Sequence, residues 1–341
     1  MEDRSKSGQK RDWNREMLAY GVGPLMYTPA IQKSAAEGII GKKYGGSYSL
    51  CFCLEDSIRD EAVEQAEDQL EQTLNDIWEA WKNGQISNEE LPLIFIRVRT
   101  PEQMGQLGMR FLAYGDILAG YVFPKFSVNE GPKYIHMMKQ LNSRSGRNMY
   151  MMPILESGDI IDMRTRKENL YAIKEMLDEV KDMVLNVRVG GNDFCSYFGV
   201  RRRMDESIYD VRAVSKILTD ILTVFSKDYV VSGPVWEYFS GDGEFWKKGL
   251  EKEIRMDILN GFIGKTVIHP NQIAVVNRCM RVRREDYRDA AAILAWEGDS
   301  LGVAKNIGGE RMNEKKTHTT WARKVMNLAK IYGVNNDEDS I

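Results

Sequence analysis

The sequence predicts an α/β protein folded as a (β/α)8 TIM barrel with a C-terminal helical extension. Three observations lead to this prediction. Short apolar runs alternate with longer amphipathic runs, eight such pairs fall within about 260 residues, and the pattern changes after residue 285. Strands that alternate with helices form parallel sheets. Eight such units in this length fit a closed barrel better than an open sheet.

The eight predicted strands are short, and several are rich in β-branched or aromatic residues. They cover residues 25–28, 49–54, 93–99, 121–126, 150–155, 184–189, 229–232 and 264–268. A segment with helical spacing follows each strand. In the segment 60–81, apolar residues recur every three or four positions, which predicts a helix with one buried face. They are Ala62, Val63, Ala66, Leu70, Leu74 and Ile77.

Beyond the barrel, residues 286–297 and 319–332 are predicted as helices, with a glycine-containing loop at 302–309 between them. Both chain ends are polar, as is usual for solvated termini. We therefore expect a polar N-terminal segment (1–19), the barrel (20–285), the helical extension (286–332) and an acidic tail (333–341).

Composition excludes several classes of protein. Hydrophobic residues make up 43% of the chain, which is too many for a disordered protein. The formal net charge of −3 argues against a nucleic-acid partner. Four scattered cysteines form no disulfide framework, no apolar stretch approaches 18 residues, and the N-terminus lacks an apolar signal segment. We expect a cytoplasmic protein with no membrane partner.

Charged residues follow the predicted strands in an orderly way. Acidic residues follow the second, fifth and sixth strands, and basic residues follow the third and fourth. These residues are Glu55, Asp56, Arg97, Arg99, Lys125, Glu156 and Asp193. Each one alone is typical of a loop or a helix cap. In a barrel of this type, however, the carboxyl ends of the strands form the active-site mouth, where these side chains would converge.

The residue types at this mouth indicate a chemistry. Glu156 and Asp193 follow neighbouring strands, and Mg²⁺ prefers one or two carboxylates together with water and substrate oxygens. Arg97 and Arg99 share one face of a strand and offer guanidinium groups to a carboxylate or an enolate oxygen. A metal ion and an arginine together stabilise negative charge that develops on a carbonyl oxygen.

Two further features have two interpretations each, and a third adds a charge. The Gly190-Gly191 pair suits either a close backbone approach or a tight turn. The run of arginines at 201–203 suits either a phosphate-bearing substrate or a solvated face. Lys265, on the eighth predicted strand, is a candidate for another charge at the mouth.

Seven segments of the chain, taken in order, carry a family resemblance. They are 26–30, 53–58, 96–99, 123–125, 154–157, 190–194 and 261–273, the last with Gly264, Lys265, His269 and Pro270 being the most specific. In these segments the sequence resembles the citrate lyase β-subunit family of C–C bond lyases, within the HpcH/HpaI aldolase superfamily. The resemblance spans roughly residues 20 to 332.

The resemblance implies a TIM barrel with a C-terminal helical extension, assembled as a homo-oligomer, a trimer or a hexamer. It also implies Mg²⁺-assisted cleavage or formation of a bond between an acyl-CoA enolate and a keto acid. The two carboxylates themselves would suit Mn²⁺ as an alternative metal. By position, Glu156 and Asp193 would ligate the metal, and Arg97 would stabilise the oxyanion. Glu314 would stand where some members place an acid that reaches a neighbouring subunit's site.

The remaining residues of the mouth are assigned to binding a small anionic substrate, either a coenzyme A thioester or a keto acid. They are Glu55, Asp56, Arg99, Lys125 and Gly191. The chain departs from the family in having Arg99 where the family has Asn, and Glu314 where it has Asp. In this it resembles a divergent subgroup found in bacterial tellurite-resistance and stress gene clusters. The additional arginine suits a more anionic substrate.

Two alternatives to a lyase remain open at this point. A metal-bound enolate site can also serve thioester hydrolysis, and a barrel can act as a non-enzymatic assembly or ligand-sensing component. The intact set of Arg97, Glu156 and Asp193 favours an enzyme, because a scaffold has no need of it.

Overall fold

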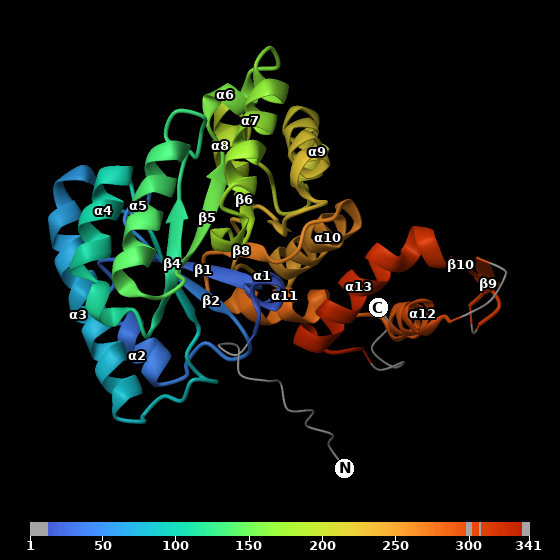
Figure 1. Cartoon of the computed structure of the whole chain (residues 1–341), viewed down its shortest axis with the longest axis horizontal. Helices are drawn as coiled ribbons and strands as arrows, with labels where there is room; N and C mark the ends of the chain where they lie inside the picture. Colours follow the sequence, from blue (N-terminus) through green and yellow to red (C-terminus); the bar gives the residue numbers. More distant parts are fainter. Residues whose placement is uncertain (1–12, 298–301, 307, 336–341) are drawn as a thin grey trace. The chain divides into compact units, whose positions relative to one another are not determined.

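The computed structural model describes residues 13–297, 302–306 and 308–335 (Figure 1). The N-terminal residues 1–12 and the end of the predicted acidic tail, 336–341, lie outside the described residues. The chain divides into two compact units, one ending at Val276 and the other beginning at Asn277. Each unit is described by itself.

The first unit is an eight-stranded parallel barrel. The strands are β1 (Pro24–Pro29), β2 (Ser49–Cys53), β3 (Leu93–Arg97), β4 (Leu118–Phe123), β5 (Tyr150–Leu155), β6 (Val187–Val189), β7 (Val231–Ser232) and β8 (Lys265–Val267). Their order is β7-β6-β5-β4-β3-β2-β1-β8, and a bridge between Gly233 and Lys265 links the two end strands. The sheet is therefore a nearly closed barrel, and the predicted (β/α)8 fold is confirmed.

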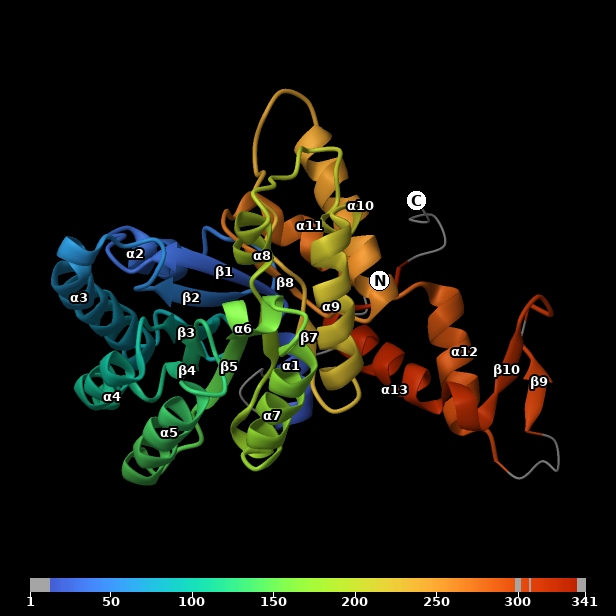
Figure 2. The same cartoon turned by 90° about the horizontal axis from the view of Figure 1, so that it is seen from above.

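Helices form the outer layer around these strands (Figure 2). They are α1 (Arg15–Gly21), α2 (Ala35–Ile40), α3 (Val63–Lys82), α4 (Pro101–Arg110), α5 (Gly131–Ser145), α6 (Gly158–Ile161), α7 (Arg166–Asp178), α8 (Gly191–Tyr197), α9 (Arg212–Phe225), α10 (Phe245–Asn260) and α11 (Asn271–Met280). Helix α1 begins within the segment expected to be polar, capped by the Asn14 side chain. On α3, four residues of the predicted face are buried, namely Ala66, Leu70, Leu74 and Ile77. Ala62 and Val63, where the helix begins, are only partly buried. Within the described residues, every helix is too short or too polar to span a membrane.

Strand register determines which side chains face the barrel interior. Pro29 pairs with Cys53, and Cys53 pairs with Arg97, so these three residues lie on one face at the carboxyl ends of their strands. Two residues earlier, Tyr27 and Cys51 share the same face, because side chains alternate along a strand. This face is the interior, since Arg188 on β6 reaches Thr266 on β8 across it.

Most predicted strands differ from the observed ones by a residue or more, and the third and fourth differ by two or more at the carboxyl end. The third ends at Arg97 instead of residue 99, because the Arg99 amide donates to the Gln103 side chain and leaves the ladder. The fourth covers Leu118–Phe123 instead of 121–126. It ends there because Pro124 has no N–H to donate and Lys125 turns into the left-handed region at φ 49°.

The second unit holds the predicted helical extension. Its elements are α12 (Arg284–Ala295), β9 (Val303–Lys305), β10 (Met312–Glu314) and α13 (Lys315–Tyr332). The segment 302–309, expected as a loop, instead contains β9, which pairs antiparallel with β10. The sequence conceals this hairpin because all three residues of β9 are exposed, so no apolar alternation marks it. Val334, in the predicted tail, pairs with Val282.

Candidate functional site

Six charged side chains meet at the carboxyl ends of the barrel strands. We call this group the mouth cluster: Glu55, Asp56, Arg97, Lys125, Glu156 and Asp193. All six were expected at the mouth from the sequence, and the structure brings them together. Their functional roles stay predictions.

Arg97 is the centre of the mouth cluster. Its Nη2 atom lies 2.7 Å from Glu55 Oε2, 3.0 Å from Asp56 Oδ2 and 3.2 Å from Glu156 Oε1. The residue is only 5% exposed, so these interactions are weakly screened by water. A guanidinium held by three carboxylates is fixed in position and charged at any physiological pH.

Lys125 links two of the acids through its main chain and its side chain. Its backbone N–H donates to Glu156 Oε1 at 3.0 Å, and its Nζ lies 2.7 Å from Glu55 Oε1. The φ of 49° that makes this possible is uncommon for a residue with a side chain. Such backbone outliers concentrate at functional sites.

Glu156 and Asp193 form a pair of carboxyl groups whose side chains interact electrostatically. Burial, reinforced by the charge of Asp193, raises the pKa of Glu156 to about 8, although Arg97 opposes the shift. Burial, with the charge of Asp56, also raises the pKa of Asp193. Two carboxyl groups with raised pKa values at short range are stabilised in their ionised form by a cation.

Gly190 makes this pair possible. A Cβ atom built on Gly190 would lie 2.2 Å from Glu156 Cβ, 2.4 Å from Glu156 Oε2 and 3.1 Å from Asp193 Oδ2. A Cβ on Gly191 would instead lie 2.7 Å from Ile208 and from Pro234. The close backbone approach is therefore made to the acids by Gly190, while Gly191 packs against the next loops. Substrate binding by Gly191 stays a prediction.

The pair fits a magnesium ion of the kind expected. Among the described residues, no three or more His, Cys, Asp or Glu side chains form a complete protein cage for a metal. Magnesium does not need one, since it binds through one or two carboxylates and keeps several waters. Glu156 Oε1 is occupied by Arg97 and Lys125, which leaves Oε2 beside Asp193 Oδ2 at the glycine.

Asp56 is the exposed acid of the mouth cluster, with 56% of its side chain accessible. Its partial burial alone would raise its pKa. Hydrogen bonding with the Glu55 side chain and the charges of Arg97 and Lys125 outweigh this effect and lower the pKa of Asp56. Asp56 is thus ionised at neutral pH.

Arg99 braces the loop that carries two of the acids. Its Nη1 lies 3.0 Å from Leu54 O, 3.3 Å from Glu55 O and 3.0 Å from Ile58 O, and its Nη2 pairs with Asp60. The guanidinium that was expected to bind substrate is thus engaged by main-chain carbonyls. Its observed contacts support the positions of Glu55 and Asp56.

Glu314 belongs to the second unit, at the end of β10. Its backbone N–H donates to His318 Nδ1 at 3.0 Å, and its Oε2 accepts from Thr317 Oγ1 at 2.7 Å. These local contacts place it at the start of α13. Its predicted action in a neighbouring subunit's site stays a prediction.

A second buried group of charges lies between the barrel wall and α10. We call it the wall cluster: Arg202, Tyr209, Glu253, Asp257 and Lys265. Lys265 Nζ lies 3.0 Å from Glu253 Oε1 and 2.7 Å from Asp257 Oδ2. Lys265 begins β8 and faces the helix, whereas Thr266 faces the interior, so Lys265 is no part of the mouth. Arg202 pairs with Glu253 in a fully buried contact, so neither a solvated face nor a phosphate site describes it.

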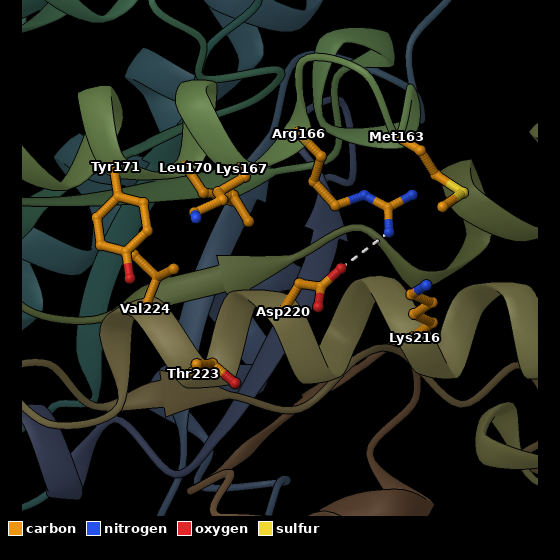
Figure 3. Close-up of a pocket in the computed structure, with 9 residues that line it drawn as sticks. All are labelled: Met163, Arg166, Lys167, Leu170, Tyr171, Lys216, Asp220, Thr223 and Val224. Carbon is orange, nitrogen blue, oxygen red and sulfur yellow. Dashed lines mark hydrogen bonds and ion pairs between the residues drawn. The ribbon is translucent and has the colours of Figure 1, made fainter.

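A hollow of about 300 Å³ lies elsewhere, between α7 and α9 on the outside of the barrel (Figure 3). Among the charged residues that line it, Arg166 pairs with Asp220 at 2.9 Å and also donates to two main-chain carbonyls. None of the nine residues that line the hollow was expected in the site. We assign the hollow no functional role and describe it as a groove between two helices.

Sequence reasoning missed two residues next to the mouth cluster. Tyr27 places its ring 5.7 Å from Arg97 Cζ, and Arg188 lies buried in the interior beside it. Both positions are inward by strand alternation, and this signal could have found them. Arg188 stands out further as a charged residue in the middle of a short apolar strand.

Comparison with known proteins decides the family. The family model described as the C–C bond lyase of the TIM-barrel fold matches residues 16–334. This chain belongs to that C–C bond lyase family. The expectation of a carbon–carbon lyase family is thereby confirmed. No curated protein sequence gives a significant match.

Solved structures of this lyase's fold are similar at low sequence identity. A citrate lyase from Burkholderia xenovorans matches over 98% of both chains, with a TM-score of 0.67 and 13% identity. CitE from Mycobacterium tuberculosis, in complex with magnesium, acetoacetate and coenzyme A, covers 91% of this chain and 99% of its own, with a TM-score of 0.54 and 18% identity. RipC from Yersinia pestis covers 76% and 95%, with a TM-score of 0.51 and 15% identity. These likenesses establish the shared barrel fold.

Proposed function

We propose that this lyase is Mg²⁺-dependent and cleaves or forms a carbon–carbon bond in a small anionic substrate, a coenzyme A thioester or a keto acid. The observation that carries the proposal is the Glu156–Asp193 pair beside Arg97, buried and with raised pKa values. The CitE structure that shares the fold contains magnesium, acetoacetate and coenzyme A. Those ligands support the choice of metal and substrate class.

The chain's own residues have separable tasks in this proposal. Glu156 and Asp193 hold the metal, which when bound supplies positive charge opposite a substrate oxygen. Arg97, fixed by three carboxylates, presents its guanidinium to the oxygen on which negative charge develops. Lys125, with 57% of its side chain exposed, binds a carboxylate of the substrate as a mobile point charge.

We infer that the protein belongs to the divergent subgroup found in tellurite-resistance and stress gene clusters. Arg99 and Glu314, the two departures from the common family pattern, support this placement. We also infer a homo-oligomer, a trimer or a hexamer, in which Glu314 reaches a neighbouring mouth. The buried free thiols of Cys51, Cys53 and Cys195 support a reducing, cytoplasmic compartment.

Calorimetric titration with MgCl₂ and MnCl₂ tests the metal assignment. Wild type should bind one ion per chain, whereas Glu156→Gln and Asp193→Asn should each lose most of the affinity, because each removes a charged ligand. Glu130→Gln, a partly exposed acid that pairs with Lys133, is the matched control and should bind like wild type. Equal binding in all four proteins would overturn the assignment.

Product analysis then separates the possible reactions. Incubation with Mg²⁺ and a panel of 3-hydroxyacyl-CoA thioesters and keto acids should yield two carbon fragments from one substrate, or one product from two, by mass spectrometry. Release of free coenzyme A with no change in the carbon skeleton would indicate thioester hydrolysis instead. A protein that binds metal yet transforms no member of the panel would favour a sensing role.

A further inference from the structure

Tyr27 lies one inward layer below Arg97 in the barrel. It is two residues before Pro29 on β1, and the register Pro29–Cys53–Arg97 places both side chains on the interior face. The Arg97 Cζ lies 5.7 Å from the centre of the Tyr27 ring. Tyr27 is partly exposed, although Leu25 below it is fully buried. In a closed barrel, that exposure is toward the mouth.

Arg188 holds the tyrosine from the other side. The residue is 1% exposed, and its Nη2 donates to Thr266 Oγ1 at 2.6 Å while its Nη1 lies 3.4 Å from Asn186 Oδ1. Its guanidinium also lies close enough to the Tyr27 hydroxyl for the two groups to interact electrostatically. None of these partners is a carboxylate, and the Arg188 Nε has no partner among the described residues. Burying an arginine in this way is costly unless the charge serves a purpose.

The chemistry of the contact orients the phenol. A guanidinium has only donors, so the Tyr27 oxygen is the acceptor in any hydrogen bond between the two groups. The phenolic proton then points away from Arg188, and the accessible side of Tyr27 is the mouth. A hydroxyl that accepts from a cation is a stronger donor to an anion, because hydrogen bonds in series polarise one another.

We propose that Tyr27 is a further substrate-contacting residue, whose hydroxyl, oriented by Arg188, donates a hydrogen bond to an anionic oxygen of the substrate at the mouth cluster. The inference rests on the proposed function. It specifies the substrate as a compact anion with one oxygen for Arg97 and one for Tyr27, such as the enolate of a 2-keto acid. Arg188 is a positioning residue that acts through Tyr27.

Oxalate is a suitable probe, because it is a planar dianion with the shape and charge of such an enolate. Its dissociation constant would be measured by calorimetry at saturating Mg²⁺ for wild type and Tyr27→Phe. Loss of a hydrogen bond to a charged group weakens binding by about 10- to 100-fold. The Mg²⁺ affinity itself should not change, since Tyr27 does not contact the acidic pair.

Tyr121→Phe is the matched control. Tyr121 is buried, and its hydroxyl has no partner among the described residues. It pairs with Ile96 and Met151, on the face opposite Arg97, so its hydroxyl is outside the mouth. Removing it should leave oxalate binding as in wild type.

A spectroscopic signature and a rescue test the positioning role of Arg188. Oxalate should perturb the near-ultraviolet tyrosine spectrum of wild type but not that of Tyr27→Phe. Arg188→Met should weaken oxalate binding and Arg188→Lys should restore part of it, because lysine also donates to the phenol. The Arg188 variants alter a buried charge and could fail to fold. In that case the comparison of Tyr27→Phe with wild type tests the proposal by itself.

The outcomes separate this inference from the proposed function. Wild-type protein without Mg²⁺-dependent oxalate binding would overturn the proposed function and this inference with it. Wild type and Tyr27→Phe that bind oxalate equally would overturn the inference alone. A loss in Tyr27→Phe with Tyr121→Phe unaffected supports both.

Discussion

The mouth cluster and the wall cluster are made of the same residue types but differ in their balance. In the wall cluster, Glu253 and Asp257 are each paired with Lys265, and Arg202 and Tyr209 engage their remaining oxygens. The mouth cluster has four acids for two bases.

The pKa values of the two buried glutamates follow this difference, although burial and the charge of Glu253 raise the pKa of Asp257 in the wall cluster. Despite burial, Lys265 and Arg202 lower the pKa of Glu253, whereas burial and a neighbouring carboxylate raise the pKa of Glu156 to about 8. In a balanced buried cluster the charges are paired within the cluster, and the cluster stabilises the fold. We expect an unbalanced one at a strand end to be completed by a ligand, because perturbed acids concentrate at functional sites.

The largest expected effect is on the wall cluster. Lys265→Met should lower the free energy of unfolding by about 3–5 kcal/mol, because it leaves two buried carboxylates without their shared cation. Denaturant unfolding measures the change, with the exposed Lys133→Met as control. A loss below about 1 kcal/mol, the size expected for a surface pair, would contradict the comparison.

At the mouth, Arg97→Lys should reduce kcat by about 10²–10³-fold, since lysine keeps the charge but loses the planar guanidinium opposite the oxyanion. Steady-state kinetics on the substrate found in the product analysis measures this effect. An unchanged kcat with a raised KM would mean that Arg97 contributes ordinary ground-state binding. Arg97 would then bind the substrate without stabilising the transition state.

The raised pKa of Glu156 in the mouth cluster should be visible in the pH dependence of stability. Glu156 has a pKa of about 8 in the folded protein and near 4.5 when unfolded, so between these values the folded state binds more protons. This group therefore makes stability fall as pH rises from 4.5 to 8.

Glu156→Gln removes that contribution. Its melting temperature relative to wild type should rise with pH, and excess Mg²⁺ should stabilise wild type most at high pH. Melting curves at several pH values, with and without MgCl₂, measure both effects. If the melting temperatures of variant and wild type change in parallel with pH, the pKa of Glu156 is not raised in the folded protein.

The smallest expected effect tests whether a neighbouring subunit contributes Glu314 to the mouth. If Glu314 acts across subunits, Glu314→Gln and Asp193→Asn should each be impaired, but equal mixing should restore activity at about one quarter of the sites. This fraction follows because a site then needs its own Asp193 and a neighbour's Glu314. Two inactive parents with no recovery in verified mixed oligomers would rule out the shared site.

The sequence predicted the barrel and most of the mouth because both depend on local patterns. Strand–helix alternation determines the fold class, and the residue after a parallel strand is at the mouth whatever the packing. Glu55, Asp56, Arg97, Lys125, Glu156 and Asp193 were found in this way. The hairpin of β9 and β10 escaped notice because its stability does not depend on an apolar pattern.

The sequence did not predict which charged residues pair with one another, because the partners lie far apart in the chain. Arg99 looked like Arg97 by alternation, yet three carbonyls of the preceding loop engage it. Arg202 belonged to a run of arginines typical of a surface, yet it pairs with Glu253 fully buried from solvent.

Local sequence by itself determined which residues are at the ends of the strands and therefore what chemistry this protein can hold. The tertiary structure decided which of those charges are neutralised and which are left for a ligand. Lys265 and Arg188 are both buried cations on short strands, but two acids of α10 neutralise the first, while the second contacts a phenol and no acid. The physical reason is that burial and pairing are properties of the assembled interior, where removal of water makes each missing partner costly.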